Sequence, residues 1–101
     1  MPHWVDVAKM GELEPGKSIA VMHERKRIAV FNIDGNIYAC NDMCPHAGGP
    51  LHQGYLKGSV VSCPWHGWTF DVAAKEDAVK DGVARYNVQI DGENIQVELP
   101  D

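Results

Sequence analysis

Two short stretches, Cys44-Pro45-His46 and Cys63-Pro64-Trp65-His66, decide how this chain of 101 residues is interpreted. Each stretch supplies one cysteine and one histidine, and Cys63 follows His46 by seventeen residues. Proline and glycine residues surround both stretches, which predicts that each lies in a tight loop between regular elements. Together the loops offer two thiolates and two imidazoles, which is the four-ligand set of a metal centre.

The mixture of sulfur and nitrogen ligands favours a two-iron, two-sulfide cluster. Thiolates suit iron that is already bonded to sulfide, and neutral imidazoles add no negative charge. Two ferric ions with two sulfides carry a positive formal charge that a pair of thiolates cancels, so such a cluster accepts an electron more easily than one with four cysteines. We therefore predict one [2Fe-2S] cluster with these ligands: Cys44, His46, Cys63 and His66.

Zinc, His52 and Cys40 require separate interpretation. A structural zinc ion is the alternative occupant of the same four residues, although zinc sites usually pair cysteines about two to four residues apart. His52 lies six residues after His46 and is a rival ligand, but we interpret it as a solvated loop histidine that adds pH sensitivity nearby. Cys40 ends an apolar run, which favours a small buried side chain over a redox role.

The neighbours of the predicted ligands are expected to shape the site. Gly48, Gly49 and Gly67 have the backbone freedom that would let their amides approach and donate hydrogen bonds toward sulfur. Trp65 and Trp68 are expected to pack against the surrounding residues, with a role for one of them in partner docking as the alternative.

The length and composition are those of one globular domain. About 60 to 70% of the unfolded surface is buried by a chain of this size, so a bound metal centre would help to hold it together. No apolar run approaches the roughly 20 residues that cross a bilayer, and we expect no membrane association. The first residues lack a basic region followed by an apolar core, and three cysteines favour metal binding over disulfides. We expect a cytoplasmic protein.

The net charge of −5 is unevenly distributed along the chain. Residues 1–40 carry five basic and five acidic groups, whereas residues 41–101 carry four basic and nine acidic groups. The window 41–70 contains only Asp42 and Lys57 as charged residues. This balance argues against nucleic acid as a partner, because phosphates require a basic surface. It favours an acidic carrier that meets basic partners.

Frequent turns and short alternating segments predict a mainly β domain. Asp34-Gly35-Asn36 and Asp91-Gly92 are turn sequences between apolar runs, so each predicts a hairpin. Residues 84–90 alternate between apolar and polar side chains and predict one strand with one buried face. The expected strands are 4–7, 18–22, 27–33, 37–40, 59–62, 68–70, 84–90 and 95–99. We expect a single domain, 1–101, in which a metal-holding lobe at about 41–70 is inserted into a β scaffold at about 1–40 and 71–101.

From Cys40 to Asp71 the sequence resembles the Rieske iron-sulfur proteins. The stretch Cys63-Pro64-Trp65-His66-Gly67-Trp68 resembles the version found in oxygenase components and their ferredoxins. This resemblance implies an all-β fold of stacked antiparallel sheets with a small cluster-binding lobe. It also implies that Cys44 and Cys63 bind the inner iron, while His46 and His66 bind the outer iron, where electrons enter and leave.

Departures from the family pattern carry a further expectation. Rieske subunits of respiratory cytochrome bc complexes have an additional cysteine in each loop, and the corresponding positions are Gly49 and Trp65 in this chain. The serine that donates a hydrogen bond to bridging sulfide in those subunits corresponds to Trp68. Because these groups are missing, we predict a cluster with a low reduction potential.

The leading functional hypothesis is a soluble Rieske-type ferredoxin. Family oxygenases need a second domain with mononuclear iron, for which 101 residues leave no room, so we expect an electron-transfer component and not an enzyme. Its expected transient partners are a flavin-dependent reductase and a terminal oxygenase, in particular an aromatic-ring-hydroxylating dioxygenase. One alternative is a small subunit resembling that of assimilatory nitrite reductase, bound to the large subunit. Another is a regulatory or structural metal-binding module.

The expected docking face surrounds His46 and His66 and is nearly free of charge. Small apolar contacts together with remote acidic steering give fast and weak complexes, which suit a shuttle. The face is expected to consist of Pro45, Ala47, Gly48, Gly49, Pro50, Leu51, Pro64, Trp65 and Gly67.

Overall fold

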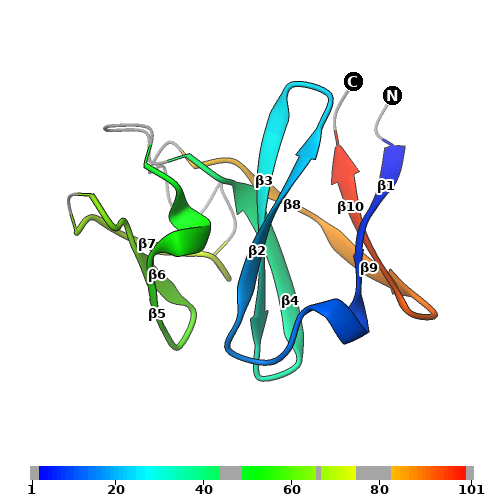
Figure 1. Ribbon diagram of the computed structural model, residues 1–101, viewed down its shortest axis with the longest axis horizontal. Helices are drawn as coiled ribbons and strands as arrows, with labels where there is room; N and C mark the ends of the chain where they lie inside the picture. Colours follow the sequence, from blue (N-terminus) through cyan, green and yellow to red (C-terminus); the bar gives the residue numbers. More distant parts are fainter. Residues whose placement is uncertain (1–2, 44–48, 66, 75–82, 100–101) are drawn as a thin grey trace.

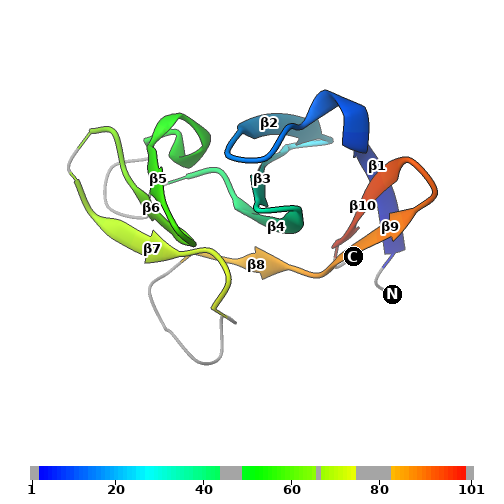
Figure 2. The ribbon, with the colours of Figure 1, turned by 90° about the horizontal axis from the view of Figure 1, so that it is seen from below.

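Three antiparallel β-sheets form successive layers in the computed structural model, which describes residues 3–43, 49–65, 67–74 and 83–99 (Figures 1 and 2). The central sheet has the order β2-β3-β4-β8, with β2 (Ser18–His23), β3 (Lys26–Ile33), β4 (Asn36–Asn41) and β8 (Arg85–Tyr86). One outer sheet has the order β1-β10-β9, with β1 (His3–Lys9), β10 (Asn94–Leu99) and β9 (Val88–Asp91). The other consists of β5 (Tyr55–Lys57), β6 (Val60–Ser62) and β7 (Thr69–Asp71).

The predicted all-β fold is confirmed. Apart from strands, the regular elements of the described residues are two 3₁₀-helices, η1 (Met10–Glu12) and η2 (Leu51–Gln53). None of the helices in these residues is long and apolar enough to cross a membrane.

Strand β3 lies at the centre of the fold, and both of its faces are buried. Ala29 and Phe31 point into a core cluster shared with the β5-β6-β7 side, which also contains Leu51, Cys63 and Phe70. Ile28 and Val30 point into a second core cluster with residues of β10. A strand covered on both sides needs a continuous apolar run, and Ile28-Ala29-Val30-Phe31 provides it.

The predicted hairpin at Asp34-Gly35 is confirmed and links β3 to β4. Ile33 pairs with Asn36, so Asp34 and Gly35 form a two-residue loop, with φ of 54° and 91° respectively. Both values are positive, as a type I′ turn requires, and this explains the Asp-Gly sequence. The buried side chain of Asn32 accepts a hydrogen bond from the amide of Gly35 at 2.8 Å and donates one to the carbonyl of Leu13, also at 2.8 Å.

The prediction of one continuous strand over 84–90 is wrong. The chain forms β8, which pairs with β4, and then β9, which pairs with β10 in a different sheet. Because the segment changes sheets at Asn87, the pattern of buried side chains does not continue through it, and Ile90 is 46% exposed. Strand β5 was also absent from the expected strands.

The short sheet β5-β6-β7 holds the loop that contains the second motif. Strand β6 ends at Ser62 and β7 begins at Thr69, so Cys63 to Trp68 form the connection between two paired strands. The sheet requires a glycine at position 54, because a Cβ atom there would lie 2.0 Å from the carbonyl oxygen of Ser62.

Candidate metal centre

The loop between β6 and β7 is shaped by its own backbone hydrogen bonds. The amide of Cys63 donates to the carbonyl of Trp68 at 2.7 Å, and the amide of Gly67 donates to the carbonyl of Cys63 at 2.9 Å. Gly67 has a φ of +74°, which a residue with a side chain rarely adopts. We expected the Gly67 amide to donate toward sulfur, but this amide instead closes the turn.

Cys63 places its thiol at the base of this loop. The residue is 2% exposed, is not in a disulfide, and belongs to the core cluster that joins the short sheet to the central sheet. A buried thiol fixed between two strand ends is well suited to hold the inner iron of a cluster, because its position depends on the packed core.

Gly49, three residues after the first motif, lies against the second motif. A Cβ atom built at Gly49 would lie 2.9 Å from Sγ of Cys63 and 3.2 Å from the Trp65 ring. The backbone that follows the first motif therefore passes directly over the cysteine of the second motif. Only glycine permits such a close approach to the buried thiol. This arrangement is expected if two loops build one cofactor site together.

The other predicted ligands, Cys44, His46 and His66, lie outside the described residues, as does Gly48. The four-ligand set and its division between two irons therefore stay predictions. The interpretation of Cys40 as a small buried side chain is confirmed, because this residue of β4 is completely buried in the same core cluster as Cys63.

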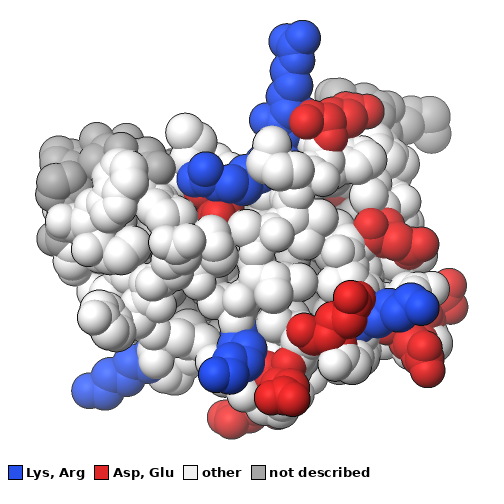
Figure 3. All heavy atoms as spheres, viewed as in Figure 1, with Lys and Arg blue, Asp and Glu red and all other residues white. Residues whose placement is uncertain are grey.

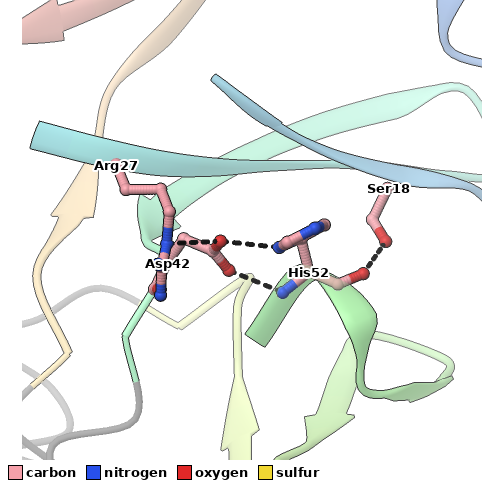
Figure 4. Close-up of polar contacts among 4 residues, drawn as sticks. All are labelled: Ser18, Arg27, Asp42 and His52. Carbon is pink, nitrogen blue, oxygen red and sulfur yellow. Dashed lines mark hydrogen bonds and ion pairs between the residues drawn. The ribbon is translucent and has the colours of Figure 1, made fainter. Parts of the chain in front are cut away.

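The interpretation of His52 as a solvated loop histidine is wrong. Its side chain is largely buried, and its Nδ1 atom lies 2.6 Å from Oδ2 of Asp42, a carboxylate with no exposed surface. Arg27 contacts the same carboxylate oxygen through Nε at 3.0 Å, and the Ser18 hydroxyl donates to the carbonyl of His52 at 2.6 Å (Figure 4). Sequence reasoning missed this group, although an acidic residue isolated in an almost uncharged window, two positions before Cys44, was the available signal.

The surface of the short sheet and its loop is apolar and carries little charge. Trp65 is 59% exposed and Trp68 is 49% exposed, so the expected packing against the surroundings covers only part of each ring and the rest faces outward. Asp42 is buried, which leaves Lys57 as the exposed charge among the described residues of 41–70. Figure 3 shows this side as mostly white, while red carboxylates gather on the side of β1, β9 and β10.

The expected docking face needs a partial correction. Leu51 and Gly49 are buried, because η2 packs into the core and Gly49 lies against Cys63, so neither is available to a partner. Pro64, Trp65 and Gly67 are exposed as expected. Pro45, Ala47 and Gly48 lie outside the described residues.

Comparisons with known proteins agree with this arrangement. A family model described as the Rieske [2Fe-2S] domain matches residues 3–95. The ferredoxin component of the naphthalene 1,2-dioxygenase system of Pseudomonas aeruginosa is 29% identical over 99 residues, which cover 95% of each chain. The biphenyl dioxygenase ferredoxin subunit of Pseudomonas sp. strain KKS102 is 33% identical over 92 residues, covering 87% of this chain and 84% of the relative.

Solved structures give the same result for the fold. The ferredoxin of carbazole 1,9a-dioxygenase from Nocardioides aromaticivorans IC177 superposes with a TM-score of 0.81 and 30% identity, covering 93% of this chain and 95% of that one. A protein described as the putative NADH-dependent nitrite reductase small subunit from Mycobacterium tuberculosis superposes with a TM-score of 0.85 at 21% identity, covering 100% and 98%. At that identity the second likeness concerns the fold alone.

Proposed function

The chain belongs to the Rieske [2Fe-2S] domain family, and from this we infer that it is a ferredoxin that carries single electrons to a terminal oxygenase. It binds one Rieske-type [2Fe-2S] cluster, whose chemistry is the reversible uptake of one electron. The relatives that match along nearly their whole length are named as ferredoxin components of dioxygenase systems. The proposed role is therefore electron transfer within a multicomponent system, without catalysis by the chain itself.

The observation that carries the proposal is the close approach of Gly49, three residues after the first motif, to Cys63 of the second motif. Gly49 approaches the Cys63 thiol so closely that no side chain fits between them, and this supports a single site built by both loops. We assign the inner iron to Cys44 and Cys63, and the outer iron to His46 and His66. The site lies in the lobe at about 41–70, which the scaffold at about 1–40 and 71–101 supports in one domain.

The residues of the chain have separate tasks in this proposal. The backbone bonds within Cys63–Trp68 hold the second loop in one shape, so little reorganisation accompanies electron transfer. The exposed rings of Trp65 and Trp68 offer an uncharged contact surface next to the proposed outer ligand His66. Three cysteines favour metal binding over disulfides, as is usual in the reducing cytoplasm, so we place the carrier there.

The proposed partners are a flavin-dependent reductase and a terminal oxygenase that hydroxylates aromatic rings, because the relatives serve naphthalene and biphenyl dioxygenases. The test mixes the purified protein with such a reductase and such an oxygenase and measures aromatic diol formation. We expect turnover that depends on this protein and saturates with its concentration. If the cluster is reduced but passes no electron to any oxygenase of this class, the assignment of the acceptor is wrong.

The alternative function is that of a small subunit of a nitrite reductase. A second measurement distinguishes it from a ferredoxin. A shuttle dissociates between turnovers, so it is expected to elute alone from gel filtration after mixing with its oxygenase. Stable co-elution with a nitrite reductase large subunit, together with nitrite-dependent oxidation of the reduced cluster, would replace the ferredoxin assignment.

A further inference from the structure

The side chain of Asp42 contacts His52, which lies ten residues further along the chain. One carboxylate oxygen accepts a hydrogen bond from the backbone amide of His52 at 2.6 Å. The other lies 2.6 Å from Nδ1 of the same residue (Figure 4). Asp42 thus holds both the backbone and the ring of His52.

Both ends of this connection are anchored to the central sheet. Arg27, in β3, donates from Nε and Nη2 to the backbone carbonyl of Asp42 at 3.1 and 2.6 Å and pairs with its carboxylate. Ser18, in β2, donates to the carbonyl of His52. Asp42 has no exposed side-chain surface, and hydrogen bonds to charged groups in such a setting are among the stronger ones in proteins.

The segment between the two ends contains the first motif. Asp42 precedes Cys44 by two residues, and Leu51, next to His52, is completely buried in the core cluster that also contains Cys63. The connection from Asp42 to His52 therefore ties the two residues that flank the segment 43–51 to each other, next to the core cluster that contains Cys63.

We propose that Asp42 and His52, oriented by Arg27 and Ser18, form a clamp that fixes both ends of the ligand-bearing segment 43–51 and so positions Cys44 and His46 for the cluster. This inference rests on the proposed function, because it takes Cys44 and His46 as ligands. Asp42 and His52 are positioning residues, since neither needs to touch the cluster. A segment with fixed ends has fewer conformations to lose when it binds iron and opens less often to release it.

The test measures how fast the oxidised holoprotein loses its cluster to an iron chelator. His52→Ala removes the ring contact with Asp42 and leaves the other three residues of the clamp unchanged. We expect the half-time of cluster loss to fall at least tenfold. The matched control is Asn32→Ala, which removes two hydrogen bonds, with Leu13 and Gly35, from a buried polar side chain in β3.

Each protein is assayed at the same number of degrees below its own unfolding temperature. A difference in global stability between two variants then does not affect the comparison of their half-times. Under this condition Asn32→Ala is expected to stay within twofold of the unchanged protein. His52→Asn keeps an amide donor close to the position of Nδ1, the atom that contacts Asp42, and is expected to restore at least half of the lost lifetime. Broader paramagnetic resonance lines in His52→Ala, reflecting a wider spread of cluster geometries, are the second readout.

If His52→Ala is purified without a cluster, the comparison uses Ser18→Ala, which removes only the hydroxyl that holds the carbonyl of His52. A half-time shortened more than twofold relative to Asn32→Ala then supports the clamp. The clamp is refuted if the half-times and line widths of the His52 or Ser18 variant match those of Asn32→Ala. A protein that holds no [2Fe-2S] cluster in its unchanged form refutes the proposed function itself, which is a distinguishable result.

Discussion

The contact between Gly49 and Cys63 makes the strongest single-residue prediction. In Gly49→Ala the added Cβ would lie 2.9 Å from Sγ of Cys63, whose position is fixed by the core. Overpacking of this kind costs about 1 to 3 kcal/mol, and we expect lower cluster occupancy and a lower unfolding temperature. Iron and sulfide analysis with thermal unfolding measures both.

Gly11→Ala is the control for this substitution, since a Cβ atom at position 11 meets nothing within 4 Å. It is expected to leave cluster occupancy and unfolding temperature close to those of the unchanged protein. A Gly49→Ala protein that behaves like Gly11→Ala would show that the close approach of the backbone at Gly49 to Cys63 is not required.

Cys40 and Cys63, the buried cysteines among the described residues, provide a second pair of variants. Cys63→Ser is expected to abolish most cluster assembly, because the hydroxyl is a poor replacement for a thiolate on iron. Cys40→Ala removes a thiol from the same core cluster, so it is expected to cost stability and to leave the cluster intact. Visible absorbance per chain measures the outcome, and equal loss of the cluster in both variants would contradict the assignment of Cys63 as a ligand.

At the scale of elements, the sequence predicted a strand correctly where a local turn sets its pairing with the adjacent strand. The hairpins at Asp34-Gly35 and Asp91-Gly92 follow from local turn chemistry, and both are present. The division of 84–90 into β8 and β9 was not predictable from alternation, because it depends on a change of partner sheet. The clamp at Asp42 was missed for the same reason: Arg27, Asp42 and His52 meet only after β3, β4 and η2 are assembled.

The turn between β3 and β4 leads to a prediction about the stability of this hairpin. Gly35 has a φ of +91°, a conformation that side chains disfavour, although a Cβ atom at Gly35 would meet no neighbouring atom within 4 Å. Gly35→Ala is therefore expected to lower the free energy of unfolding by about 1 to 2 kcal/mol through backbone strain alone. Denaturant titration measures this. An unchanged midpoint would contradict the assigned turn.

At the scale of the whole molecule, the cluster environment predicts a low midpoint potential. Gly49 and Trp65 correspond to the cysteines that link the loops in respiratory Rieske subunits, and because neither carries a thiol this link cannot form here. We expect a midpoint in the lower part of the family range of about −150 to +300 mV. Protein-film voltammetry measures it, and a value near the upper end would contradict this reasoning.

The charge distribution of the molecule makes a kinetic prediction. The net charge of −5 attracts a basic partner over a distance, while the nearly uncharged lobe makes the close contacts (Figure 3). The association rate with the oxygenase is therefore expected to fall as salt shortens the screening length from about 10 Å at 0.1 M to about 3 Å at 1 M. Stopped-flow oxidation of the reduced cluster measures this rate. A rate independent of salt would remove electrostatic steering from the account.

The paramagnetic resonance spectrum of the reduced protein tests the central claim most directly. Two loops that bring sulfur and nitrogen ligands to one diiron cluster predict a red-brown protein with a rhombic signal from one unpaired electron per chain and equal amounts of iron and sulfide. A colourless protein that shows no signal after reduction and holds stoichiometric zinc would contradict the claim.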